Sequence, residues 1–97
     1  MEELVYLNDL FDLYGDLLTE KQQKYFMDYY FHDLSYGEIS SKYQVSRNAV
    51  FHQLKDIEKK LFLFEEKLKL YDKKRKINDI INMIEDEKIK KELASLF

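Results

Sequence analysis

Apolar residues recur every three or four positions along most of this chain, which is the spacing of amphipathic helices. The first run predicts a helix that stops at Gly15, since glycine readily adopts the left-handed conformation that closes a helix. No two alternating runs flank an Asn-Gly or Asp-Gly turn, so strands are not expected. The apolar residues that follow this three-four spacing are Leu4, Leu7, Phe11, Tyr14 and, beyond the stop, Leu18.

Polar residues predict where the next helices begin. Thr19 can cap a second helix, with Gln22 three residues on, as a capping box requires. Ser35 and Glu38 repeat that pattern at the start of a third helix. The second helix is expected to end at residues 32–33, and its apolar side comprises Phe26, Tyr29 and Tyr30.

The third and fourth helices are expected to form a tight helix-turn-helix. Residues 44–46 interrupt the helical pattern, and Ser46 can cap a fourth helix 11 residues after the cap at Ser35. Gln44 lies in the turn and would be strained if its backbone is left-handed. The core stripe predicted for the fourth helix comprises Val50, Leu54, Ile57, Leu61 and Phe64.

The last third of the chain predicts a helical extension. The fourth helix is expected to run from Arg47 to Leu70, about 36 Å at 1.5 Å per residue. Asp72 is expected to cap a fifth helix and Asp86 a sixth. The residues expected to face inward are Ile77, Ile80, Ile81 and Ile84 in the fifth helix, and Ile89, Leu93 and Leu96 in the sixth.

These elements predict an all-α protein with a single domain over residues 1–97. A helix-turn-helix core covers about 18–61, an N-terminal helix precedes it, and a helical extension covers about 62–97. The absence of cysteine, the acidic start at Glu2 and Glu3, and the lack of a long apolar run predict a cytoplasmic protein without a membrane span. The net charge of -3 is uneven, because residues 1–34 hold 8 acidic and 2 basic side chains.

Three short motifs resemble region 4 of bacterial sigma factors. Residues 17–23 read Leu-Leu-Thr-Glu-Lys-Gln-Gln, residues 34–40 read Leu-Ser-Tyr-Gly-Glu-Ile-Ser, and residues 45–50 read Val-Ser-Arg-Asn-Ala-Val. Together with Glu-Glu-Lys-Leu-Lys-Leu-Tyr at 65–71, they resemble the YlxM-like family of small bacterial proteins over about Leu4 to Tyr71. The resemblance implies a sigma-region-4-like helix-turn-helix regulator, and the family's gene neighbourhood implies a link to the signal recognition particle pathway.

The fourth helix is the candidate for reading DNA. In a helix-turn-helix the second helix lies in the major groove, where arginine can pair with guanine and asparagine with adenine. The alternative is an ordinary solvated helix face, since residues 35–60 carry a net charge of only +2. The residues expected to face outward for DNA are Arg47, Asn48, Phe51, His52 and Lys55.

No arrangement typical of catalysis, a metal site or a cofactor site is found. The only histidines, His32 and His52, are 20 residues apart on different predicted helices, and no set of nucleophile, base and orienting residue is visible. The basic run from Lys73 to Lys76 is either a phosphate contact or a solvated helix start. We therefore expect a binding protein and not an enzyme.

Two kinds of partner follow from these patterns. DNA is the first, and the alternative is a protein partner such as the signal recognition particle GTPase or its particle, favoured by the acidic first third and by Phe51. The apolar stripes from Phe62 to Phe97 also predict a homodimer formed through the C-terminal helices. The alternative is that these helices fold back over Leu4, Leu7 and Phe11.

Overall fold

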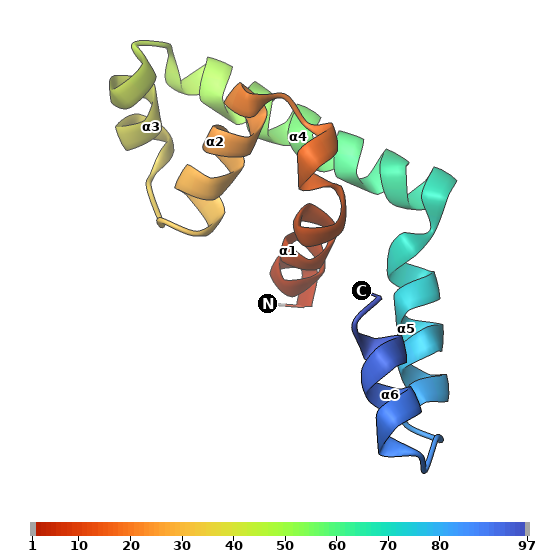
Figure 1. The fold of residues 1–97 in the computed structure, drawn as a ribbon. Helices are drawn as coiled ribbons and strands as arrows, with labels where there is room; N and C mark the ends of the chain where they lie inside the picture. The colour runs from red at the N-terminus through yellow and green to blue at the C-terminus, as the bar shows by residue number, and fades with distance from the viewer. Residues whose placement is uncertain (1, 97) are drawn as a thin grey trace.

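The computed structural model describes residues 2–96, and all regular structure in that range is helical. Helices α1, α2 and α3 pack against the long helix α4, while α5 and α6 pair beyond its C-terminal end (Figure 1). The predicted all-α class is confirmed. The elements are α1 (Glu2–Tyr14), the 3-10 turn η1 (Gly15–Leu17), α2 (Glu20–Tyr30), α3 (Tyr36–Tyr43), α4 (Arg47–Leu68), α5 (Leu70–Ile81) and α6 (Glu87–Ala94).

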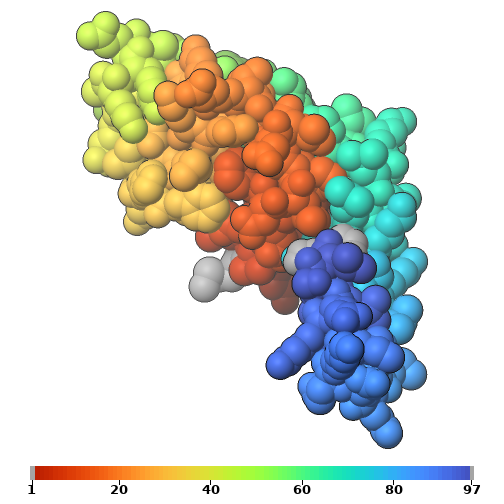
Figure 2. Space-filling view, in the orientation of Figure 1, coloured from red at the N-terminus to blue at the C-terminus, as the bar shows by residue number. Residues whose placement is uncertain are grey.

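Helix α4 supplies the surface on which the first three helices pack. Its 22 residues make it about 33 Å long at 1.5 Å per residue. The predicted stripe is buried at Val50, Leu54, Ile57 and Leu61, which join the side chains of α1, α2 and α3 in one core. The molecule is elongated, 54 × 25 × 24 Å, with the C-terminal helices projecting from one end (Figure 2).

The predicted capping boxes are confirmed. Thr19 Oγ1 accepts from the Gln22 backbone N–H at 3.1 Å, and the Gln22 side chain accepts from the Thr19 N–H in return. Ser35 and Glu38 form the same reciprocal pair at 3.1 Å. Such pairs satisfy backbone donors that a helix start otherwise leaves free, so a local sequence signal is enough to place both helices.

Gly15 does not act as predicted. None of the glycines has a positive φ, and the chain continues from α1 into the tight turn η1 in place of a left-handed stop. Gly15 is instead buried beneath the Phe11 ring, where an added Cβ would lie 3.3 Å from a ring carbon. Close packing against the Phe11 ring therefore explains why a glycine occupies position 15.

The junction between α4 and α5 also differs from the prediction. Helix α4 ends at Leu68, two residues early, because Lys69 adopts a left-handed conformation with φ 55°. Helix α5 then begins at Leu70, so the predicted cap at Asp72 is wrong. The Glu65 carboxylate takes that role from the preceding helix.

The inward face predicted for the C-terminal helices is only partly correct. Asp86 caps α6 as predicted, accepting from two backbone N–H groups. In α5, however, Ile81 is buried whereas Ile80 is 58% exposed. Helix α5 packs against α1, yet Leu4 stays exposed, so the extension covers only part of α1. Ile89 and Leu96 are exposed as well, and Phe97 lies outside the described residues.

Within residues 2–96, every helix is too short or too polar to cross a membrane.

Candidate nucleic-acid interface

A left-handed residue and a serine cap set the angle between α3 and α4. Gln44 closes α3 with φ 57°, so its backbone is left-handed, the conformation in which strain is expected. Two residues later Ser46 Oγ accepts from the Ala49 N–H at 3.0 Å and begins α4. Ile39 of α3 and Val50 of α4 are fully buried in the shared core. The turn and this packing hold the first turns of α4 at the surface.

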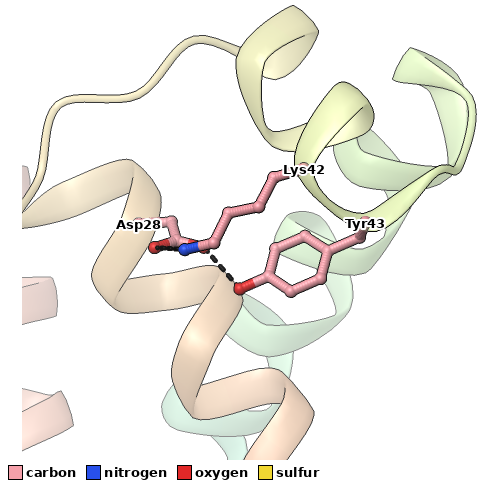
Figure 3. Close-up of polar contacts among 3 residues, drawn as sticks. All are labelled: Asp28, Lys42 and Tyr43. Atoms are coloured by element: carbon pink, nitrogen blue, oxygen red, sulfur yellow. Dashed lines mark hydrogen bonds and ion pairs between the residues drawn. The ribbon is translucent and has the colours of Figure 1, made fainter.

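A buried carboxylate ties α3 to α2 (Figure 3). Asp28 of α2 is only 4% exposed, and it accepts hydrogen bonds from Lys42 Nζ at 3.0 and 3.2 Å and from the Tyr43 hydroxyl at 2.6 Å. Burial alone would raise the pKa of Asp28, but the hydrogen bonds from Tyr43 and Lys42 hold that pKa below its ordinary value of 3.8.

This three-residue contact, which we call the Asp28 brace, was missed by sequence reasoning. Its two donors are neighbours in the last turn of α3, so the brace fixes the end of α3 that leads into the turn. A buried carboxylate destabilises the fold unless its oxygens accept hydrogen bonds, so Asp28 requires the donors on α3. The available signal was a single acidic residue within the aromatic run of residues 25–31.

All five residues predicted to face DNA are exposed along the first nine residues of α4. Arg47 lies over the start of α3, and a Cβ added to Gly37 would come within 2.8 Å of a guanidinium nitrogen. The glycine therefore leaves room for the arginine. Asn48 and His52 lie one helical turn apart, which places them on the same side of α4.

Phe51 is partly held by neighbouring rings. It is 37% exposed and packs edge-on against Tyr36 with ring centroids 5.9 Å apart. Tyr36 in turn stacks on Tyr29 at 5.1 Å, so α4 is connected to α2 by aromatic contacts. The Lys55 ammonium lies 5.6 Å from the centre of the Phe51 ring.

The charge of Lys55 is partly compensated within the protein. Its Nζ lies 3.3 Å from Glu58 Oε2, and the other Glu58 oxygen accepts a hydrogen bond from the Tyr30 hydroxyl. Burial and this bond to Glu58 raise the pKa of Tyr30, so the phenol stays a donor. Of the basic side chains predicted for DNA, Arg47 thus has more freedom than Lys55 to meet a phosphate or a base.

The motifs and the helix-turn-helix geometry agree with a family comparison. A family model with the description "Putative helix-turn-helix protein, YlxM / p13 like" matches residues 1–96. The chain belongs to this family. The predicted resemblance is confirmed, and it extends beyond Tyr71 through the C-terminal helices.

Relatives in several bacteria match nearly the whole of this YlxM/p13-like chain. A protein of Halalkalibacterium halodurans is 41% identical over 95 residues, which cover 98% of this chain and 86% of that protein. The YlxM protein of Bacillus subtilis is 38% identical over 95 residues, covering 98% and 81%. A Bacillus cereus member is 39% identical over 103 residues, covering 99% and 92%.

The basic run of this family member lies apart from the first turns of α4. Residues 73–76 belong to α5, beyond the far end of α4 from Arg47 (Figure 1). Lys76 pairs with Asp72 at 3.1 Å, and the Arg75 guanidinium lies 5.9 Å from the Tyr71 ring centre. The structure therefore does not bring the two basic segments together into one patch.

Metal-ligating side chains do not cluster in the part of the chain that the structure describes. Across residues 2–96, no group of three or more histidine, cysteine or acidic side chains is placed to hold a metal ion. His32 lies in the loop after α2 and His52 on the outer face of α4.

Proposed function

We propose that this chain is a single-domain, cytoplasmic helix-turn-helix regulator that binds duplex DNA through the N-terminal half of α4, without catalysis. The supporting observation is the two-sided character of that segment. One face is buried at Val50 and Leu54, and the opposite face presents the five exposed residues. A helix of this kind fits the major groove, where its N-terminal side chains reach base edges.

Each exposed residue has a distinct role in this proposal. Arg47 forms a two-point contact with a guanine, and Asn48 forms one with an adenine. His52 and Phe51 contact base edges farther along the groove, and Lys55 contacts a phosphate. The ion pair between Lys55 and Glu58 weakens that phosphate contact, so the proposal predicts modest affinity with a shallow salt dependence.

The C-terminal helices would set the arrangement of two subunits. We propose a homodimer through α5 and α6, because Ile80, Met83, Ile89 and Leu96 are all exposed on this short hairpin. Pairing two such faces would remove apolar area from water at about 25 cal/mol per Å². Two recognition helices could then reach successive major grooves, as in other helix-turn-helix dimers.

Substitution of Arg47 tests the DNA-binding proposal. In Arg47→Ala, duplex affinity should fall about tenfold, as expected for loss of one good two-point contact, while helicity stays unchanged. Lys67→Ala, which removes an exposed charge near the C-terminal end of α4, is the matched control. Fluorescence anisotropy at several salt concentrations, with a duplex that the wild-type protein selects from a mixed-sequence pool, measures both. Equal DNA affinity of Arg47→Ala and the wild type would contradict the proposal that α4 contacts DNA through Arg47.

A second candidate function is protein binding linked to the signal recognition particle. The net charge of -6 on residues 1–34 and the exposed part of Phe51 favour it, since acidic surfaces repel DNA. A pull-down from cell extract with and without nuclease separates the two functions. Recovery of the particle's GTPase regardless of nuclease, with no DNA retained, would support this second function over the first.

A further inference from the structure

A groove with an aromatic floor lies between the start of α1, the end of α2 and the loop before α3. It consists of two hollows of about 490 and 300 Å³, and both are lined by Leu4, Tyr29 and Tyr30. The first hollow also includes Asp33, and the second also includes Glu3. Because the hollows share three lining residues, they form one continuous surface.

The floor of this groove is held in place before any partner arrives. Tyr30 donates to Glu58, and the Tyr29 ring meets the Tyr30 ring edge-on at 4.9 Å. Tyr29 also stacks on Tyr36 from the other side. Leu4 contributes an apolar side chain that is 39% exposed. Rigid tyrosines of this kind offer a large contact area at a low cost in conformational entropy.

The rim of the groove is acidic. Glu3, Asp33 and Glu58 line it, against a single base, Lys55, whose ammonium already pairs with Glu58. None of the ion pairs among residues 2–96 involves Glu3 or Asp33. These two carboxylates therefore remain available to an incoming positive charge.

We propose that this groove binds a basic peptide segment of another protein. Apolar side chains of the peptide would pack over Leu4 and Tyr29, and flanking lysines or arginines would meet Glu3 and Asp33. The aromatic floor could also stack nucleic-acid bases, but the two free carboxylates would repel the phosphate backbone, so a basic peptide fits better. The inference rests on acidic and aromatic residues and not on Arg47 or Asn48, although Lys55, which lines the groove, also belongs to the proposed DNA contact.

A pair of synthetic probes tests the charge requirement on the full chain. One probe is a short amphipathic peptide of leucine and lysine, and the other has glutamate at every lysine position. Binding of each peptide is followed by the fluorescence anisotropy of a dye attached to its end. The lysine peptide should bind with an affinity that falls as salt is added, and the glutamate peptide should not bind.

A double variant assigns the binding to the groove. Glu3→Gln combined with Asp33→Asn removes both carboxylates, and asparagine tolerates the left-handed backbone of Asp33, φ 58°. Its Kd for the lysine peptide should rise about fivefold. The matched control, Asp79→Asn with Glu92→Gln, removes two exposed charges from α5 and α6 and should leave Kd unchanged.

Three results would overturn the inference. The first is absence of binding, or equal binding of the two peptides. The second is an equal loss of affinity in the groove variant and in its control, which would indicate only net charge. The third is dissociation of a dimer in the groove variant during sedimentation, which would assign the groove to a second copy of this chain.

Discussion

The Tyr14 hydroxyl donates a hydrogen bond to Glu65 Oε1 at 2.6 Å, across 51 positions of the sequence. The same hydroxyl accepts from the Leu70 backbone N–H at 3.0 Å. Glu65 also accepts from the N–H groups of Tyr71 and Asp72, so one carboxylate caps the start of α5. These contacts join α1, α4 and α5 at the point where the chain turns.

We expect Tyr14→Phe to destabilise the protein by about 1–3 kcal/mol, since it removes a partner from buried polar groups. Burial and the hydrogen bond to Glu65 raise the pKa of Tyr14 to about 12. Urea denaturation measures the stability. Tyr71→Phe is the matched control, since the Tyr71 hydroxyl makes no hydrogen bond within residues 2–96. Equal losses of stability in both variants would contradict the proposed role of Tyr14.

The contrast between this junction and the other helix ends shows what the sequence can predict. Thr19 and Ser35 have their capping partners three residues away, so the signal lies within one turn of helix. Lys69 is left-handed, and Tyr14 and Glu65 accept from the backbone N–H groups that follow it. Tyr14 comes from another helix. A contact between distant segments leaves no local pattern in the sequence. The sequence therefore predicts a cap at Asp72, whereas Glu65 and Tyr14 provide the capping contacts.

The candidate site likewise has some features that the sequence predicts and others that it does not. The outward positions of Arg47 and His52 follow from helical periodicity once the core stripe is known. The Asp28 brace and the pairing of Lys55 with Tyr30 through Glu58 depend on how helices pack together. Periodicity also failed at Ile80, because a repeating apolar stripe does not say whether another helix covers it.

The Asp28 brace predicts a loss of stability in acid. The pKa of Asp28 is lowered on folding, so its contribution is fully present above about 3.8 and is lost as pH falls through the folded-state value. Asp28→Asn should be less stable at neutral pH and should lose less stability on acidification below pH 4. Thermal denaturation of both proteins from neutral pH down to strong acid checks this. If the stabilities of the wild type and of Asp28→Asn fall equally with pH, the protonation of Asp28 does not account for the loss of stability in acid.

Gly37→Ala should lower the affinity for DNA while leaving the stability of the protein almost unchanged. The added methyl must displace the Arg47 guanidinium, a flexible group, and alanine favours helix, so stability should change by no more than about 1 kcal/mol. Duplex affinity should fall, as in Arg47→Ala, whereas Ser41→Ala on the exposed side of α3 should leave it unchanged. In an Arg47→Ala background the Gly37 substitution should have no further effect on affinity. Additive losses would show that the two residues act separately.

Ile80→Asp tests the proposed dimer. Sedimentation equilibrium of the wild type should give twice the chain mass of 11.9 kDa, and Ile80→Asp should give the single mass. The residue is 58% exposed within the chain, so the substitution should leave the fold of each subunit intact. Leu17→Asp, equally exposed but in η1 and therefore outside α5 and α6, should remain dimeric. A wild-type mass of 11.9 kDa would exclude the dimer.

The most direct test of the DNA-binding proposal is to map the contact surface by NMR. Mixed-sequence duplex DNA is added to the isotopically labelled full chain, and the backbone amide shifts are followed. The largest changes should fall on residues 46–55, with little change in α5 and α6 apart from effects of dimerisation. Shifts concentrated on α1 or on residues 73–76, or no shifts at all, would contradict the proposal that α4 is the recognition helix.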